Sequence, residues 1–258
     1  MSSLQGEFAR LAAAGERGAL VTVVSTEGEP EVGSRVLVGA DGSVSGSFGS
    51  DALDSAAREV AEELMWGTER SELHEVDGVG LFVDITAPSP RIFIFGAVDF
   101  ALALCRTARV TGWRPYVIDP RSRFATPERF PEAEEVVAAW PAEAVERLGG
   151  IDRATYIAII HHDPKLDDAA LQVAFASDTP YIGAMGSRRA QAKRRERMVA
   201  AGIAEEHLER VSAPIGLDIG ALGAAETALS IMAEIVAVRN GHGGGRLSAA
   251  RGRIHEAV

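Results

Sequence analysis

The sequence predicts an α/β protein, with a doubly wound parallel sheet in its C-terminal part and a smaller α+β domain before it. In the first 86 residues, short β-branched runs are separated by turn signals, which is typical of antiparallel hairpins. After residue 90, apolar runs alternate with amphipathic segments, a pattern that requires crossover connections and hence parallel strands. Pro88 and Pro90 separate the two patterns, because proline cannot donate a hydrogen bond to a sheet.

Composition and charge narrow the functional classes. The chain has 258 residues, of which 47% are hydrophobic and 24% charged, and these proportions exclude a disordered chain. Its formal net charge of -11 argues against nucleic acid or an anionic lipid surface as a partner. Cys105 is the single cysteine, so no intrachain disulfide can form, and the N-terminus lacks a basic segment followed by an apolar core. We therefore expect a cytoplasmic protein with no membrane anchor.

Residues 1–86 are expected to form the α+β domain, and residues 87–90 a linker. Hydrophobic residues at helical spacing follow the capping residues Ser50 and Asp51, which indicates a helix. The turn pair Asp41-Gly42 between two short runs indicates a hairpin. The expected elements are a helix at 4–14, strands at 19–25, 34–38 and 43–48, the helix after residue 50, and strands at 73–76 and 81–85.

Residues 91–241 are expected to form the doubly wound domain, and residues 242–258 a flexible tail. The expected strands are 91–95, 115–118, 135–138, 155–160 and 181–185, and the expected helices are 99–111, 142–148, 167–176, 187–201 and 224–238. Ligands of such sheets bind beyond the carboxyl ends of the strands. The loops after residues 95, 118, 160 and 185 are therefore the places where a binding site is expected.

The first two of these loops argue against an ordinary dinucleotide site. A dinucleotide fingerprint requires glycine where this chain has Val98, because the backbone must approach the pyrophosphate closely. Asp119, in contrast, stands where an acid would hold a ribose hydroxyl, so NAD(P) remains a less favoured alternative. The second loop contains Asp119, Arg121 and Arg123. These residues either bind a polar ligand or form a solvent-exposed surface.

The third loop brings two histidines, a carboxylate and a lysine to the same edge. Histidine exchanges protons near neutral pH, so His162 and Asp163 are interpreted as ligand contacts. The structural alternative is that Asp163, followed by Pro164, begins the next helix. Metal binding is disfavoured, because adjacent histidines on an extended segment point to opposite sides.

The fourth loop is the strongest anion site in the sequence. Gly186 permits a tight turn, and Ser187 can cap the helix that follows. The free amides of the first turn, together with Arg188 and Arg189, can bind a phosphate or another oxyanion. The later charges of this helix, at 193–197, are interpreted as mostly solvated.

Two further features concern a loop and the cysteine. Residues 212–220 are punctuated by glycine and proline and carry one carboxylate, Asp218, so they cannot be regular throughout. Their role is open from the residues alone. Cys105 lies among apolar residues of a predicted helix, which favours burial over a reactive thiol.

Three separated motifs carry a family resemblance. They are His162-Asp163-Pro164-Lys165-Leu166-Asp167, Tyr181-Ile182-Gly183 with Gly186-Ser187-Arg188-Arg189, and Pro214-Ile215-Gly216-Leu217-Asp218-Ile219-Gly220. In this order they resemble the Rossmann domain of the XdhC/CoxI family, accessory proteins of molybdenum hydroxylases such as xanthine dehydrogenase and carbon monoxide dehydrogenase. The chain departs from the family at Ala52, where a cysteine is usual, and at Val98, where glycine is usual.

The resemblance implies a chaperone rather than an enzyme. Such a protein binds the molybdenum cofactor (molybdopterin), protects it while a cysteine desulfurase or other sulfurtransferase installs a sulfido ligand, and delivers it to the apo-hydroxylase. Family analogy also implies a homodimer. The alternatives are an NAD(P)-dependent oxidoreductase and a cofactor-free docking protein, and no catalytic or metal-ligating residue is assigned. The residues expected to contact the cofactor are Gly96, Asp119, Arg121, His162, Asp163, Gly183, Gly186, Ser187, Arg188, Arg189 and Asp218.

Overall fold

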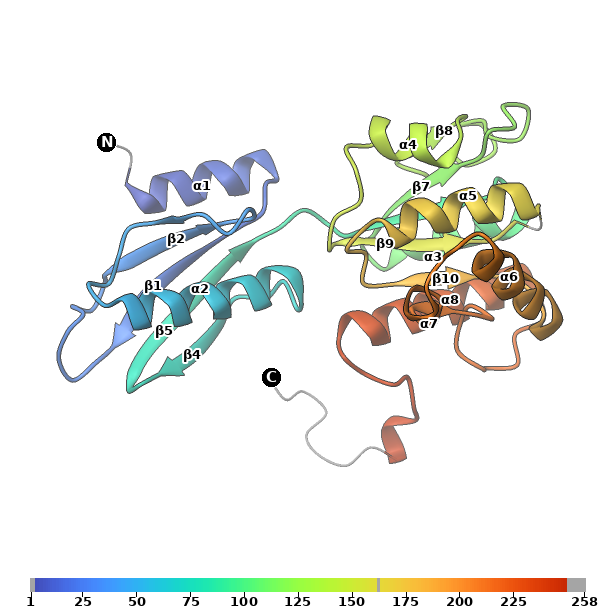
Figure 1. The fold of residues 1–258 in the computed structure, drawn as a ribbon. Coiled ribbons are helices and arrows are strands. Elements are labelled where there is room, and N and C mark those ends of the chain that lie inside the picture. The colour runs from blue at the N-terminus through green and yellow to red at the C-terminus, as the bar shows by residue number, and fades with distance from the viewer. Residues whose placement is uncertain (1–2, 162, 250–258) are drawn as a thin grey trace. The chain divides into compact units, whose positions relative to one another are not determined.

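The computed structural model describes residues 3–161 and 163–249 (Figure 1). The chain divides into two compact units, Met1–Pro88 and Ser89–Val258. Among the described residues, every helix is too short or too polar to span a lipid bilayer. Most of the expected tail, residues 250–258, lies outside the described part of the chain.

The first unit is an antiparallel sheet with strand order β3-β2-β1-β5-β4. Its strands are β1 (Gly18–Ser25), β2 (Arg35–Gly39), β3 (Val44–Ser45), β4 (Glu72–Val76) and β5 (Val79–Thr86), and its helices are α1 (Leu4–Ala14) and α2 (Asp51–Trp66). Alternate residues of β1, including Val21 and Val23, pack against the buried face of α2 that contains Leu64. The expected hairpins are confirmed, although the strand expected at 43–48 is reduced to two residues.

The second unit is a parallel sheet with strand order β11-β10-β9-β6-β7-β8. The two central strands are β6 and β9. From β6 the chain continues through β7 to β8 at one edge, and from β9 it continues through β10 to β11 at the other edge. The strands are β6 (Arg91–Phe95), β7 (Arg114–Ile118), β8 (Glu135–Val137), β9 (Thr155–Ile159), β10 (Ile182–Ala184) and β11 (Val211–Ser212). This is the strand order of a Rossmann fold, and it places the switch point between β6 and β9.

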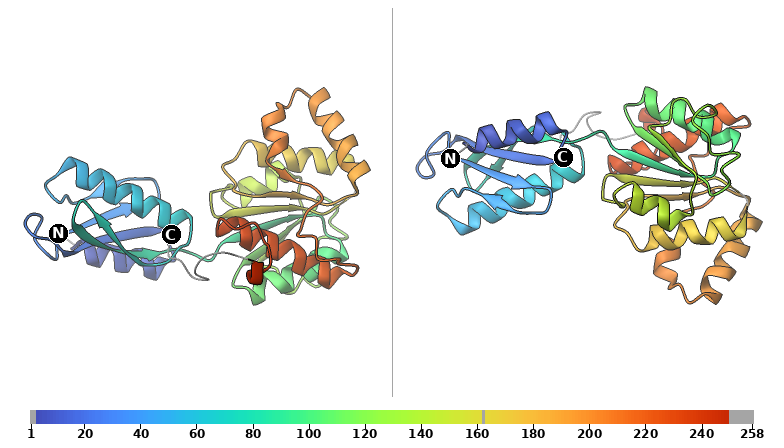
Figure 2. Two further views of the ribbon diagram at one scale, coloured as in Figure 1. Left: turned by 90° about the horizontal axis from the view of Figure 1, so that it is seen from below. Right: turned by 90° about the horizontal axis from the view of Figure 1, so that it is seen from above.

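Helices cover both faces of this sheet (Figure 2). They are α3 (Asp99–Val110), α4 (Pro141–Arg147), α5 (Pro164–Phe175), α6 (Arg188–Ala200), α7 (Glu205–Glu209) and α8 (Ala224–Arg239), and a short 3-10 turn, Leu247–Ala249, follows. Ile94 of β6 faces the core shared with α3 and α8, whereas Phe95 faces the core shared with α4 and α5. Successive side chains of a strand point to opposite faces of the sheet. Because helices cover both faces, both sets of side chains are buried, which explains why these strands are continuous hydrophobic runs. Cys105 is fully buried, as expected, and burial raises the pKa of its thiol to about 12.

Two differences from the expected elements matter for the site. Helix α5 begins at Pro164 rather than at residue 167, because Asp163 caps it and proline occupies its first turn. The short elements α7 and β11 were not expected, and β11 extends the sheet beyond β10 just before the irregular loop.

Candidate functional site

The switch point brings together the ends of β6 and β9. Gly96, directly after β6, has φ 122, and a Cβ atom there would lie 3.1 Å from both Cβ and the backbone nitrogen of His161. A Cβ atom at position 96 would therefore be packed so tightly against the end of β9 that β9 would have to shift by a few tenths of an ångström. The positive φ and the close approach of β9 both favour glycine here, whatever ligand the crevice holds.

Asp119, at the end of β7, is fully buried and its carboxylate is already filled by hydrogen bonds. Oδ2 accepts from the Ala97 backbone nitrogen at 2.9 Å and from Nη2 of Arg121 at 2.7 Å. Oδ1 accepts from the backbone nitrogen of Arg121 at 3.0 Å and from its Nε at 2.9 Å. Burial opposes ionisation, but these donors outweigh it and hold the pKa of Asp119 below its usual value.

This arrangement has a consequence for a dinucleotide. A ribose hydroxyl could bind Asp119 only after displacing a protein donor. Val98 begins α3 with no side-chain cap, so the turn offers neither the glycine nor the free acid that NAD(P) recognition needs. The geometry therefore makes Asp119 and Arg121 a brace between the loops after β6 and β7.

The end of β9 positions His161 and Asp163 differently. Asp163 is exposed, and its Oδ1 accepts from the backbone nitrogen of Lys165 at 2.9 Å, so the capping role is confirmed. His162 lies outside the described residues, and its expected ligand contact stays a prediction. His161, which was not singled out from the sequence, is only 4% exposed.

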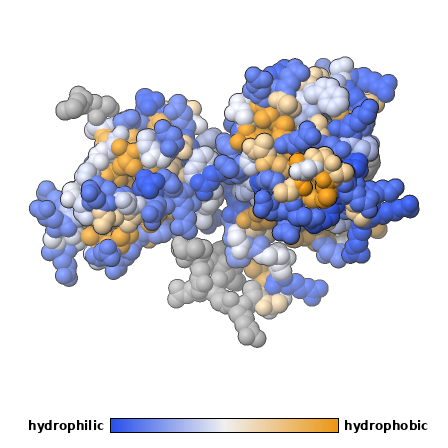
Figure 3. Space-filling view, viewed as in Figure 1, coloured by the Kyte–Doolittle hydropathy of each residue, from blue (hydrophilic) through white to orange (hydrophobic). Residues whose placement is uncertain are grey.

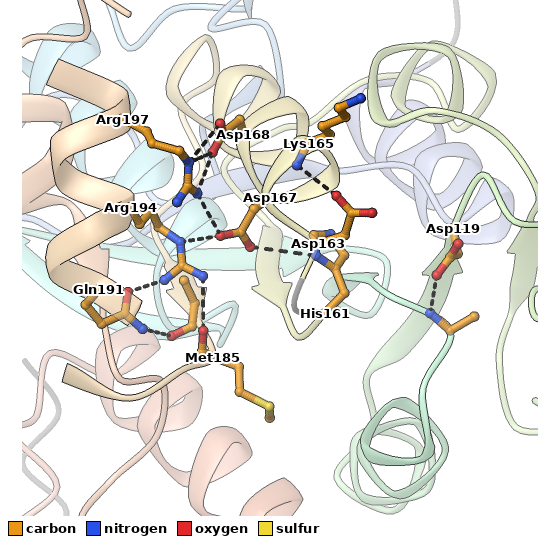
Figure 4. A network of polar contacts seen from close by, with 12 residues as sticks. Asp119, His161, Asp163, Lys165, Asp167, Asp168, Met185, Gln191, Arg194 and Arg197 are labelled. Atoms are coloured by element: carbon orange, nitrogen blue, oxygen red, sulfur yellow. Dashed lines mark hydrogen bonds and ion pairs between the residues drawn. The ribbon is translucent and has the colours of Figure 1, made fainter. Parts of the chain in front are cut away.

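His161 faces Asp167 of α5 (Figure 4). Nδ1 of His161 lies 3.7 Å from Oδ1 of Asp167, which is too long for a hydrogen bond. Within the described part of the chain, both buried atoms lack a hydrogen-bond partner. Burial lowers the pKa of His161 despite the nearby carboxylates of Asp167 and Asp119, so the imidazole is neutral near pH 7.

The other oxygen of Asp167 is held by α6. Nε of Arg194 lies 2.5 Å from Oδ2 of Asp167, and its Nη2 donates to the carbonyl of Met185 at 3.0 Å. Arg197 pairs with Asp168 at 2.9 Å. The expectation of solvated charges on this helix is wrong for Arg194, which is buried, because α5 supplies acidic partners.

The first turn of α6 remains open to an anion. Gly186 has φ 135, and Oγ of Ser187 accepts from the backbone nitrogen of Ala190, so Ser187 is the expected cap. Arg188 and Arg189 are both exposed. Hydrophilic side chains cover the outer face of α6 (Figure 3). A helix N-terminus with adjacent guanidinium groups favours an anionic ligand.

The loop after β11 is anchored rather than free. The backbone nitrogen of Gly216 donates to Oε2 of Glu234 at 2.8 Å, and the same carboxylate accepts from the hydroxyl of Tyr181. A Cβ atom at Gly183 would lie 2.4 Å from Cδ1 of Ile215, so glycine lets the loop close over β10. Asp218, at the outer part of the loop, is exposed.

A cavity of about 210 Å³ lies between α5 and α6 at this edge of the sheet. It is lined by His161, Pro164, Asp167, Met185, Gly186, Ala190, Lys193, Arg194 and Arg197. Of the expected contact residues that the structure describes, Gly186 alone is in this lining. The remainder lie in neighbouring loops of the same edge, except Gly183, which is within β10, and Arg188 and Arg189, which begin α6. Among the described residues, no group of three His, Cys, Asp or Glu side chains could hold a metal ion.

Two protein-family models match this chain. The model of the XdhC Rossmann domain matches residues 92–235, which is more than half of the chain, and the XdhC and CoxI family model matches residues 11–77. The chain belongs to the XdhC and CoxI family. Its predicted α/β fold and family resemblance are both confirmed, and residues 92–235 are the XdhC Rossmann domain.

Three curated proteins are similar in sequence to this XdhC family chain. The chain is 27% identical over 88% of its length to the uncharacterized protein YqeB of Escherichia coli, of which it covers 44%. It is 30% identical over 62% of its length to a probable xanthine dehydrogenase subunit from Bacillus subtilis, covering 46% of that protein. It is 28% identical over 59% of its length to the molybdenum cofactor insertion chaperone PaoD of Escherichia coli, covering 41%. The chain thus spans less than half the length of these relatives.

A solved structure shares the fold. The protein described as a xanthine dehydrogenase from Bacillus halodurans superposes with a TM-score of 0.62 at 24% identity, covering 90% of this chain and 65% of that one. At this identity the similarity supports the fold alone.

Proposed function

We propose that this XdhC family chain is a maturation factor for a molybdenum hydroxylase, which binds the molybdenum cofactor at the carboxyl edge of its parallel sheet. The observation that carries the proposal is the cavity between α5 and α6, which combines unfilled buried hydrogen-bonding atoms with a basic rim. The name of the relative PaoD, a molybdenum cofactor insertion chaperone, supports the same ligand.

The residues present fit a phosphorylated pterin. Nδ1 of His161 and Oδ1 of Asp167 are buried and unfilled within the described chain, which is unfavourable unless a ligand or water satisfies them. The first turn of α6 with Arg188 and Arg189 can hold the phosphate group. When bound, the cofactor supplies the molybdenum-dithiolene chemistry of the recipient enzyme; the protein's residues bind it and shield it from water.

The proposed partners follow from this role. An apo-hydroxylase would receive the cofactor, and a cysteine desulfurase or other sulfurtransferase would install the sulfido ligand before transfer. The exposed basic residues of α6, such as Arg188 and Arg189, lie next to the cavity and are available for such contacts. NAD(P) is the weaker ligand proposal, because the hydrogen bonds to Asp119 leave no free carboxylate oxygen for a ribose.

Co-expression with cofactor biosynthesis tests the proposal. The purified protein should retain molybdenum, measured by mass spectrometry, and an oxidised pterin, measured by fluorescence. The double variant R188A/R189A should retain several-fold less of both, whereas R195A, which removes an exposed charge from the same helix, should retain them. Wild-type protein without molybdenum and pterin, yet stabilised by NADH or NADPH in a thermal-shift titration, would refute the role.

A further inference from the structure

The floor of the α5–α6 cavity has a defined hydrogen-bonding pattern. His161 and Asp167 are only 4% and 5% exposed, and both line the cavity. Their facing atoms, Nδ1 and Oδ1, are 3.7 Å apart and have no partner among the described residues. Because the carboxylate can only accept, and Nδ1 of a neutral imidazole can carry a proton, the floor offers one acceptor beside one donor.

Neighbouring contacts fix this pattern in place. The second oxygen of Asp167 is occupied by Nε of Arg194 at 2.5 Å, so the carboxylate cannot rotate without breaking that ion pair. The Arg194 guanidinium is held in turn by the carbonyl of Met185 and by Oε1 of Gln191. The free oxygen of Asp167 therefore has a fixed direction, which is a requirement for selective recognition.

The size and walls of the cavity suit one flat ring system. Its volume of about 210 Å³ is several times that of a water molecule, which occupies roughly 30 Å³ in the liquid. It is below the roughly 300–1,000 Å³ of pockets that enclose whole drug-sized ligands, so it holds part of a larger molecule. Pro164, Met185 and Ala190 provide apolar wall surface, and the thioether of methionine packs well against aromatic rings.

Charged residues at the opening of the cavity determine how the ligand is oriented. Gly186 and Lys193 line the cavity where it meets the first half of α6, and Arg197 lies on the same helix. An anionic substituent is favoured there by the helix N-terminus and the cations. The neutral, hydrogen-bonding part of the ligand then occupies the floor.

We propose that the floor of this cavity binds the amino-substituted pyrimidine edge of a pterin through two hydrogen bonds. The exocyclic 2-amino group donates to Oδ1 of Asp167, and the adjacent ring nitrogen N1 accepts from Nδ1 of His161. This assignment rests on the proposed function and names the part of the cofactor that the cavity takes. Neither His161 nor Asp167 is among the residues that were expected from the sequence to contact the cofactor.

A pair of analogues tests this directly on the wild-type protein. Lumazine monophosphate carries a carbonyl oxygen at position 2 and a proton on N1, so it presents the reverse donor and acceptor pattern to the floor. In fluorescence titrations, pterin monophosphate should bind at least about tenfold more tightly than lumazine monophosphate, since a carbonyl facing a buried carboxylate leaves both groups unsatisfied. Equal affinities would overturn the proposal, even if D167N failed to fold.

Two variants complete the test. D167N should abolish the preference for the pterin, because its amide presents either a donor or an acceptor to the ligand. D168N is the matched control: Asp168 is on the same helix and pairs with Arg197, but it does not line the cavity, so D168N should keep the preference. Preserved preference in a folded D167N protein would also overturn the proposal.

The two experiments distinguish a wrong maturation role from a wrong pterin contact. If wild-type protein co-purifies with molybdenum and pterin but shows no preference between the analogues, the proposed function stands and the pterin-edge assignment is wrong. If it discriminates between the analogues through Asp167 but never retains molybdenum, the assignment stands and the maturation role is wrong.

Discussion

Replacement of Arg194 by methionine should destabilise the second unit strongly. Arg194 is 7% exposed, and its guanidinium contacts Asp167 at 2.5 Å and the carbonyl of Met185 at 3.0 Å. Methionine keeps much of the side-chain length but leaves a buried carboxylate without its cation. Breaking a buried ion pair on one side costs about 3–5 kcal/mol, in contrast to roughly 0–1 kcal/mol for an exposed pair.

Arg195 provides the matched control for this prediction. It is the next residue of α6 and pairs with Glu205, but its side chain is 48% exposed. R195M should therefore change the free energy of unfolding of the second unit by less than about 1 kcal/mol. R194M should lower the melting temperature of the unit by about 10 °C, given roughly 2–4 °C per kcal/mol for a domain of this size.

Urea and thermal unfolding, followed by far-UV circular dichroism, would measure both variants. The double variant R194M/D167N should recover part of the loss, because the uncompensated charge is removed together with its partner. If R194M and R195M unfold within about 0.5 kcal/mol of each other, the ion pair does not stabilise the α5–α6 contact and the reasoning fails.

Three further predictions concern the switch point and the floor of the cavity. G96A should destabilise the protein by about 1–3 kcal/mol in urea titrations, because its Cβ meets His161, whereas G112A, with nothing within 4 Å, should cost less; equal losses would contradict the packing argument. Burial lowers the folded pKa of His161 below 6.5, so the free energy of unfolding should begin to fall as pH drops below about 6.5, where the unfolded chain binds a proton that the buried imidazole does not, and should continue to fall down to the folded pKa; H161Q should show a shallower decline, and identical pH profiles would count against a neutral buried imidazole. D119N should weaken the brace to Ala97 and Arg121 by about 1–3 kcal/mol, and an unchanged unfolding midpoint would show that these hydrogen bonds contribute nothing net.

The strands of the second unit other than β11 could be predicted because each is a short apolar run followed by a turn signal. Alternation of these runs with helical segments was sufficient to predict a parallel sheet, and hence the edge where ligands bind. Elements α7 and β11 could not be predicted, because five and two residues are too few to display a period.

The candidate site was predicted less completely, for a physical reason. The turn at Gly186 and the cap at Ser187 are local signals, and the structure has both. The partnership of Arg194 with Asp167 is not local: it joins two helices, and nothing in the spacing of charges on α6 distinguishes a buried arginine from its exposed neighbour. His161 was overlooked because its importance comes from burial next to Asp167, which only the packing of α5 reveals.

Helix α6 has six basic residues on a chain whose formal net charge is -11. Because electrostatic attraction decays over about 8 Å at physiological ionic strength, an anion experiences this positive region only when it is already close to the edge of the sheet. The net negative charge of the whole chain disfavours non-specific binding of anions. Arg194, Arg195 and Arg197 are already paired with carboxylates of the chain, so an acidic surface that covers α6 should compete with a bound anion mainly for Arg188 and Arg189.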